Sequence, residues 1–271
     1  MSTDAVERQP GQFARARFDA RKRAWLRRVW WVFPVLVLLE IAIPVVLGSI
    51  LQPGHIGFYS GFGLGVAVAM VILLSDSPPH HIERWRQGAE GERATARALR
   101  PLLHDGWELI NDIDTGRGNI DHVLIGPAGV FLLESKNLNG LASVHADVLS
   151  VRWREDPDDG YEVSQLPPRA RAASAKLSRS LADAGLGRVW VQPVIVLWAD
   201  FAQRSILPER VAWVQGKSLA TVLAQRPARL RPADVARIAA VVRQLGALSN
   251  RQATFHRTGG ELSKGDTAAV R

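Results

Sequence analysis

The 271-residue sequence contains no cysteine. Disulfide bonds and thiolate metal sites are therefore excluded, and a bound metal would need oxygen or imidazole ligands. Lys and Arg are absent from residues 29–83, whereas residues 1–28 hold eight of them against three acids, a net charge of +5. Residues 84–271 carry 26 basic and 20 acidic residues, a net charge of +6. This excess suits a polyanion such as nucleic acid, although a solvated basic surface explains it equally well.

Two apolar runs lie in the part of the chain that lacks basic residues. Residues 30–50 are interrupted only by Glu40 and Ser49, and residues 56–74 contain no charge. At about 1.5 Å per residue, each run is long enough for a hydrocarbon layer of roughly 30 Å. Residues 51–55 include Pro53-Gly54, a turn signal. The pattern predicts a transmembrane hairpin in a lipid bilayer over residues 29–75, in preference to a cleaved signal peptide or a buried core hairpin.

The basic residues also predict an orientation for this hairpin. They flank both of its ends and are absent from the turn at 51–55, so both termini and the soluble domain are expected in the cytoplasm, in a multi-pass protein of the cell membrane. Gly57, Gly61 and Gly65 recur every four residues, a spacing that allows helices to approach closely, either within the hairpin or between copies of the chain in a homo-oligomer. Glu40, near the middle of the first run, is either functional or a protonated or partner-facing carboxyl, and we favour the second interpretation.

The remainder of the chain alternates between helical and extended patterns. A turn at 126–129 joins residues 120–125 and 130–136 into a β-hairpin, and the apolar run 191–198 is typical of a central buried strand. This order predicts an α/β fold with a mixed β-sheet flanked by helices. The expected helices are 88–104, 168–184, 219–223 and 233–245, and the other expected strands are 106–110, 141–151 and 211–214.

The expected hairpin carries the residues best suited to chemistry. Asp121 begins its first strand, and its second strand ends in Glu134-Ser135-Lys136. Because strand side chains alternate, Glu134 and Lys136 share a face, and pairing across the turn brings Asp121 close to Glu134. Asp121, Glu134 and the Ser135 carbonyl could hold Mg²⁺ or Mn²⁺, which would activate a water for attack on a phosphoryl group. The structural alternative is a simple ion pair between Glu134 and Lys136 at a strand end.

Residues 84–200 resemble the nuclease-related domain family, which shares the restriction-endonuclease-like fold and a D…(D/E)-x-K site. The resemblance implies that Asp121 and Glu134 are metal ligands, that Lys136 is the catalytic lysine, and that Glu92 is an additional acid. His122 alternates with Asp121 and is expected to pack rather than bind metal. The matching motifs are Gly88-Ala89-Glu90-Gly91-Glu92, Gly118-Asn119-Ile120-Asp121-His122-Val123-Leu124-Ile125-Gly126-Pro127 and Gly129-Val130-Phe131-Leu132-Leu133-Glu134-Ser135-Lys136.

One stretch departs from the family pattern, in which Asn-Pro-x-x-Gln opens the helix after the hairpins. This chain has Pro167-Pro168-Arg169-Ala170-Arg171 there, with Gln165 nearby. Gln165, Arg169 and Arg171 are therefore candidate nucleic-acid contacts rather than a conventional motif. Two functions stay open: a membrane-anchored, divalent-metal-dependent nuclease acting on DNA or RNA at the cytoplasmic side, and a non-catalytic membrane module that binds nucleic acid or protein.

These observations divide the chain into five expected parts. Residues 1–28 form a basic arm, 29–75 the hairpin, 84–200 the nuclease-related domain, 201–248 a strand and helix extension of that domain, and 249–271 a disordered tail. The expected partners are nucleic acid, the bilayer and further copies of the chain. No small-molecule cofactor is expected beside the metal.

Overall fold

The computed structural model describes residues 9–31, 56–76, 80–114, 119–156, 158–208 and 210–265, with isolated residues between 34 and 46. By contacts, the chain divides into two units. One unit is Ala14–Arg86, and the other combines Met1–Phe13 with Gln87–Arg271.

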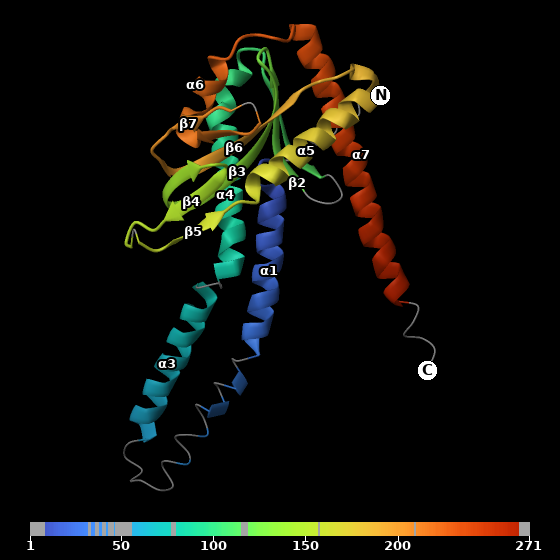
Figure 1. Cartoon of the computed structure of the whole chain (residues 1–271). Helices are drawn as coiled ribbons and strands as arrows, with labels where there is room; N and C mark the ends of the chain where they lie inside the picture. Colours follow the sequence, from blue (N-terminus) through green and yellow to red (C-terminus); the bar gives the residue numbers. More distant parts are fainter. Residues whose placement is uncertain are drawn as a thin grey trace. The chain divides into compact units, whose positions relative to one another are not determined.

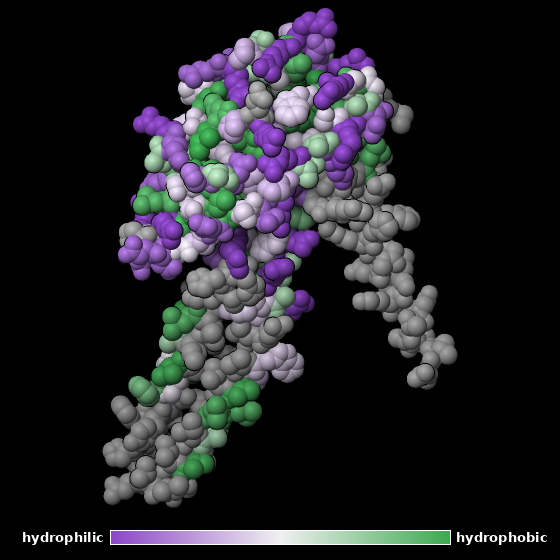
Figure 2. Space-filling view, viewed as in Figure 1, coloured by the Kyte–Doolittle hydropathy of each residue, from purple (hydrophilic) through white to green (hydrophobic). Residues whose placement is uncertain are grey.

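The unit Ala14–Arg86 contains most of α1 (Gln12–Trp30), all of α3 (Ile56–Asp76) and the start of α4 (His80–Leu103). The guanidinium groups of Arg17 and Arg21 lie 5.9 and 5.3 Å from the ring centroid of Trp85, within the range of cation–π attraction. The helix α3 exposes a series of apolar side chains, which are green in Figure 2. They include Phe62, Leu64, Val66, Val68, Ile72 and Leu73.

Among the described residues, no helix is both long and apolar enough to cross a membrane. The prediction of a multi-pass membrane protein is therefore contradicted within the described residues, and neither the two transmembrane helices predicted at 29–75 nor the cytoplasmic placement of the domain is supported. Most of the first apolar run, including Glu40, lies outside the described residues.

The glycine spacing in α3 receives no support as an interface. No described atom lies within 4 Å of the Cβ positions of Gly57, Gly61 or Gly65. The predicted contacts with lipid and with another copy of the chain are therefore unsupported.

The larger unit is built on a sheet of eight strands. The sheet is mixed, as the sequence predicts. Its main path is β1-β2-β3-β6-β8-β7, and β4 and β5 extend the sheet from β3. The pairs β3–β6 and β6–β8 are parallel, and the other pairs are antiparallel. The strands are β1 (Glu108–Asp114), β2 (Asn119–Gly126), β3 (Gly129–His145), β4 (Val148–Arg152), β5 (Gly160–Val163), β6 (Val191–Phe201), β7 (Ser205–Ile206) and β8 (Ala212–Gln215).

Helices cover both faces of this sheet (Figure 1). The helix α4 and the short α6 (Leu219–Ala224) pack on one face, where Leu124 and Leu133 are buried. On the other face, α5 (Leu166–Leu181) and α7 (Pro232–Gly265) pack over Val123 and Leu132. Because β2 and β3 alternate their apolar residues between two helix layers, the hairpin is buried on both sides. A π-helical turn, η2 (Ala182–Leu186), follows α5, and a 3₁₀ turn, η3 (Gly216–Ser218), precedes α6.

Three elements are longer than the sequence predicts. The helix α4 begins at His80, and β3 runs through the Asn-Gly at 139–140, with a register shift against β6 between Asn137 and Leu141. The helix α7 extends to Gly265 and so occupies most of 249–271, for which disorder was predicted. Arg, Gln, Ala, Glu and Leu in that stretch favour helix, and extending an existing helix needs no new nucleus.

The packing of Trp107 against the hairpin turn gives a stability prediction. A Cβ at Gly126 would lie 2.1 Å from the Trp107 ring, closer than any real contact. We expect Gly126→Ala to lower the free energy of unfolding by about 1–3 kcal/mol, because the buried ring must shift. Gly88→Ala is the matched control, since its Cβ would meet nothing within 4 Å and alanine favours a helix. Urea unfolding of both variants tests this, and equal stabilities would contradict it.

Candidate active site

The candidate site lies where β2 separates from β3. Their antiparallel pairing starts at Gly126 and Gly129 and ends at His122 and Leu133. Asp121 and Glu134 are the next residues on the two strands, beyond the last pair. Strand β3 continues beside β6, with Glu134 opposite Ile195. By alternation, Asp121, Glu134 and Lys136 follow the face opposite to Leu133.

Direct contacts hold three of the predicted residues together. The carboxylate oxygen Oδ2 of Asp121 accepts a hydrogen bond of 2.8 Å from the main-chain N–H of Ser135. Nζ of Lys136 donates to Oε1 of Glu134 at 2.6 Å, and both side chains are about 30% exposed, at 31% and 29%. The acids and the lysine therefore form one half-buried cluster that water can reach.

Glu92, on α4, interacts with this cluster through its charge, and no hydrogen bond or ion pair of the described residues joins it to Asp121, Glu134 or Lys136. Glu92 is only 7% exposed, and its pKa is raised to about 7, first by burial and then by the negative charges of Asp112 and Glu134. Lys136 and the main-chain N–H of Gly11 partly oppose this rise. Burial also raises the pKa of Asp121 well above its usual value, and the charges of Glu134 and Glu92 raise it further. Glu92, Asp121 and Glu134 therefore lie close enough to repel one another.

Lys136 supplies the compensating positive charge. Burial lowers the pKa of its ammonium group, but Glu134, Asp121 and Glu92 outweigh burial, and the net effect raises the pKa. The negative charges of three carboxylates act on one ammonium, and of the three only Glu134 is hydrogen-bonded to it. Oε2 of Glu92 is buried without a hydrogen-bond partner in the described part of the chain. This donor set, oxygen-rich and short of positive charge, fits a hard divalent cation.

Few side-chain ligands are available for such a cation. Across the described residues, no three or more His, Asp or Glu side chains are grouped so that they could hold a metal ion together. A metal here would therefore combine Asp121 and Glu134 with the main-chain carbonyl of Ser135 and with water, a mixture that is usual for Mg²⁺.

Sequence reasoning missed Asp112, which lies beyond the strand expected at 106–110. Asp112 lies in β1, is 1% exposed and has a positive φ of 58°. Its carboxylate accepts hydrogen bonds from the N–H of Phe13 at 3.0 Å and from Nδ2 of Asn119 at 2.5 Å. This strained residue adds negative charge beside Glu92. Only the placement of β1 next to α4 would have revealed it.

A second missed group connects α4 to the site strand. The hydroxyls of Thr95 and Ser135 share a hydrogen bond of 2.8 Å, and Nε1 of Trp198 donates to the Thr95 oxygen at 2.8 Å. Thr95 lies one helical turn after Glu92, and that spacing is the sequence signal for a shared helix face. The bonds fix the distance between the helix that carries Glu92 and the strand that carries Glu134.

His122 packs on the α4 side of the sheet, as predicted. It is completely buried, its Nδ1 lies 2.7 Å from Oδ1 of Asn111, and burial lowers its pKa to about 4. The imidazole is therefore neutral at physiological pH and structural in role.

The three predicted nucleic-acid contacts are not joined to the acids. Gln165 immediately precedes α5 and is exposed, as is Arg169. Arg171 pairs with Asp147 at 3.4 Å, at the turn between β3 and β4. No hydrogen bond or ion pair of the described residues connects these side chains to Asp121, Glu134 or Lys136, and their role stays a prediction.

The comparisons with known proteins identify the domain that contains this site. Residues 87–198 match the family model of the nuclease-related domain. The matched range contains Glu92, Asp121, Glu134 and Lys136, so the resemblance found in the sequence is confirmed for this domain. An uncharacterized protein of Bacillus anthracis is 27% identical over 95 residues, which are 33% of this chain and 43% of that protein. The match thus spans less than half of the relative. No solved structure matches the chain.

Proposed function

We propose that the nuclease-related domain hydrolyses phosphodiester bonds of DNA or RNA with the help of Mg²⁺ or Mn²⁺. The observation that best supports this is the pair of contacts where β2 and β3 separate, from the Ser135 N–H to Asp121 and from Lys136 to Glu134, with the charges of Glu92, Asp121 and Glu134 all acting on Lys136. A protein with no need for a cation at this place would gain stability by neutralising one of these carboxylates. The net charge of +6 over residues 84–271 suits a polyanionic substrate.

Each residue has a distinct task in this proposal. Asp121 and Glu134 hold the metal together with the Ser135 carbonyl, and the metal, when bound, lowers the pKa of a water and offsets charge on a phosphoryl oxygen. Lys136, held by Glu134 at 2.6 Å, places a positive charge where negative charge develops during attack. Glu92, with a pKa of about 7, can take up or release a proton near neutral pH.

Metal dependence is the direct test. We expect the full-length protein to cleave at least one of labelled single-stranded DNA, double-stranded DNA and RNA in Mg²⁺ or Mn²⁺. Cleavage should stop in excess EDTA and return when metal is added above the chelator, because Asp121 and Glu134 alone cannot activate water at neutral pH. Intact substrates under all metal conditions would contradict the proposal.

A second candidate is a domain that binds nucleic acid without cutting it. The specific observation in its favour is that α5 lacks the family's Asn-Pro-x-x-Gln opening and that Arg171 is tied to Asp147. This candidate predicts nucleic-acid binding that persists in EDTA and after Asp121→Ala, with no cleavage in either protein. Gel-shift and cleavage assays on the same samples distinguish the two functions.

A further inference from the structure

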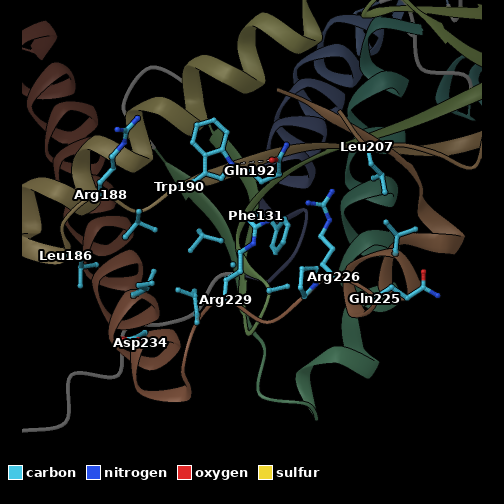
Figure 3. Close-up of a pocket in the computed structure, with 18 of the residues that line it drawn as sticks. Phe131, Leu186, Arg188, Trp190, Gln192, Leu207, Gln225, Arg226, Arg229 and Asp234 are labelled. Atoms are coloured by element: carbon cyan, nitrogen blue, oxygen red, sulfur yellow. Dashed lines mark hydrogen bonds between the residues drawn. The ribbon is translucent and has the colours of Figure 1, made fainter. Parts of the chain in front are cut away.

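A cavity of about 800 Å³ lies in the larger unit, and neither Asp121 nor Glu134 lines it. It is bounded by the β2–β3 turn with the start of β3, by residues 186–192, and by the segment 225–238 (Figure 3). Val130 lines it, whereas Glu134 follows four residues later, about 13 Å further along an extended strand. The cavity is therefore separate from the candidate active site, and its volume falls in the range of small-molecule sites.

Positive charge dominates the walls of this cavity. Four arginines line it, against one acid, Asp234. That carboxylate is already engaged by the guanidinium of Arg231, through bonds of 2.8 and 3.2 Å. Four positive charges against one negative leave a net charge of +3 on the lining. The four arginines are Arg188, Arg226, Arg229 and Arg237.

Arg226 and Arg229 lie close enough for their positive charges to repel each other. Burial lowers the pKa of Arg226, and the charge of Arg229 lowers it further. The guanidinium of Arg226 lies 5.7 Å from the ring centroid of Phe131, which fixes it over the start of β3. A bound anion would relieve the repulsion between these two cations, and guanidinium groups suit phosphate oxygens in particular.

An aromatic surface lies beside this charge. Trp190 lines the cavity and is 62% exposed, and its Nε1 donates to Oε1 of Gln192 at 3.2 Å. That bond holds the indole in place and leaves a flat apolar surface available. Figure 3 shows Trp190 and Gln192 linked in this way above Phe131 and Arg226. Indole rings in such positions bind other flat rings by stacking.

Hydrogen bonds to main-chain carbonyls hold the walls together, so the cavity does not depend on a ligand for its shape. The N–H groups of Arg229 and Leu230 donate to the carbonyl of Pro127 at 2.7 and 2.9 Å. A guanidinium nitrogen of Arg237 donates to the carbonyl of Gly185 at 3.3 Å. These bonds tie the segment 225–238 to the hairpin turn and to η2, and such preorganisation favours binding.

We propose that this cavity binds a free nucleotide, with its phosphates against Arg188, Arg226 and Arg229 and its base against Trp190. The volume accommodates one nucleoside phosphate, the lining charge suits a ligand with several negative charges, and the exposed indole supplies the stacking surface. The site goes beyond the proposed nuclease activity and does not depend on it, because binding requires neither metal nor the carboxylates.

Calorimetric titration of the full-length protein in EDTA tests this proposal, with ATP, AMP, adenosine and tripolyphosphate as probes. EDTA prevents a nucleotide from reaching the acids through a metal ion. We expect ATP to bind and Arg226→Gln to weaken it about 10-fold or more, the worth of one charge-assisted hydrogen bond. Trp190→Ala should weaken the binding of ATP by a similar factor and leave the binding of tripolyphosphate unchanged. Arg100→Gln, an exposed arginine on α4, is the matched charge control and should bind ATP like wild type.

Three outcomes would overturn the proposal. The first is no heat of binding for any probe at millimolar concentration. The second is tripolyphosphate binding as tightly as ATP with no effect of Trp190→Ala, which would mean a plain anion site. The third is an equal loss from Arg100→Gln and Arg226→Gln, which would mean attraction to overall charge. Circular dichroism of each variant establishes that the protein is folded before it is titrated.

Discussion

Glu134→Gln is expected to lower metal-dependent cleavage by at least about 100-fold, because it removes both a proposed metal ligand and the hydrogen-bond partner of Lys136. The change keeps the size of the side chain, and Glu134 is partly exposed, so the fold should be retained. Initial cleavage rates at saturating Mg²⁺, measured on whichever substrate the wild-type protein cuts, give the comparison. Glu155→Gln is the matched control, since Glu155 is exposed and lies outside the cluster.

Asp121→Asn, in the neighbouring strand β2, tests the same site. The amide oxygen of asparagine can still accept the Ser135 N–H, so the 2.8 Å contact that joins the strands is preserved. Cleavage should fall about as far as in Glu134→Gln, whereas the fold should be at least as stable. If either variant kept more than half of the wild-type rate, the site would have to lie elsewhere or the activity would belong to a contaminant.

The parts of this site that the sequence predicts are the local ones. Asp121, Glu134 and Lys136 belong to one hairpin with a short turn, so alternation and pairing suffice to bring them near one another. The mixed sheet and the buried strand at 191–198 can also be predicted from the sequence, because continuous apolar runs reflect burial on both faces. The resemblance to a known family added the expectation for Glu92, which no spacing in the sequence could supply.

The parts that sequence reasoning missed depend on packing between distant segments. Asp112 becomes relevant only because β1 lies beside α4 and the N-terminal segment at Phe13. Thr95 and Trp198 are 103 positions apart and meet across the α4–sheet interface. The arginine-lined cavity unites residues of the hairpin turn, η2 and the start of α7, and its four arginines belong to no motif noted in the sequence.

The strained charge cluster also predicts how stability depends on pH. The pKa of Glu92 rises from 4.5, its usual value, to about 7 in the folded protein. The folded state therefore binds this proton more tightly than the unfolded state does, and the resulting stability is present below about pH 4.5 and lost as pH rises through 7. At about 1.4 kcal/mol per pKa unit, Glu92 alone accounts for roughly 3 kcal/mol. The raised pKa of Asp121 acts in the same direction.

Urea unfolding of the protein in EDTA between pH 4.5 and 8 measures this effect. We expect Glu92→Gln to gain stability relative to wild type as pH rises, by up to roughly 3 kcal/mol at pH 8, because glutamine has no charge to bury. Glu155→Gln, which removes an exposed carboxylate outside the cluster, is the matched control and should show no such gain. Mg²⁺ should reduce the difference at pH 8, since a cation favours the ionised carboxylates. If the wild-type and Glu92→Gln curves ran parallel across this range, the carboxylates would not repel one another as the cluster requires, and the strongest support for a metal at this site would be lost.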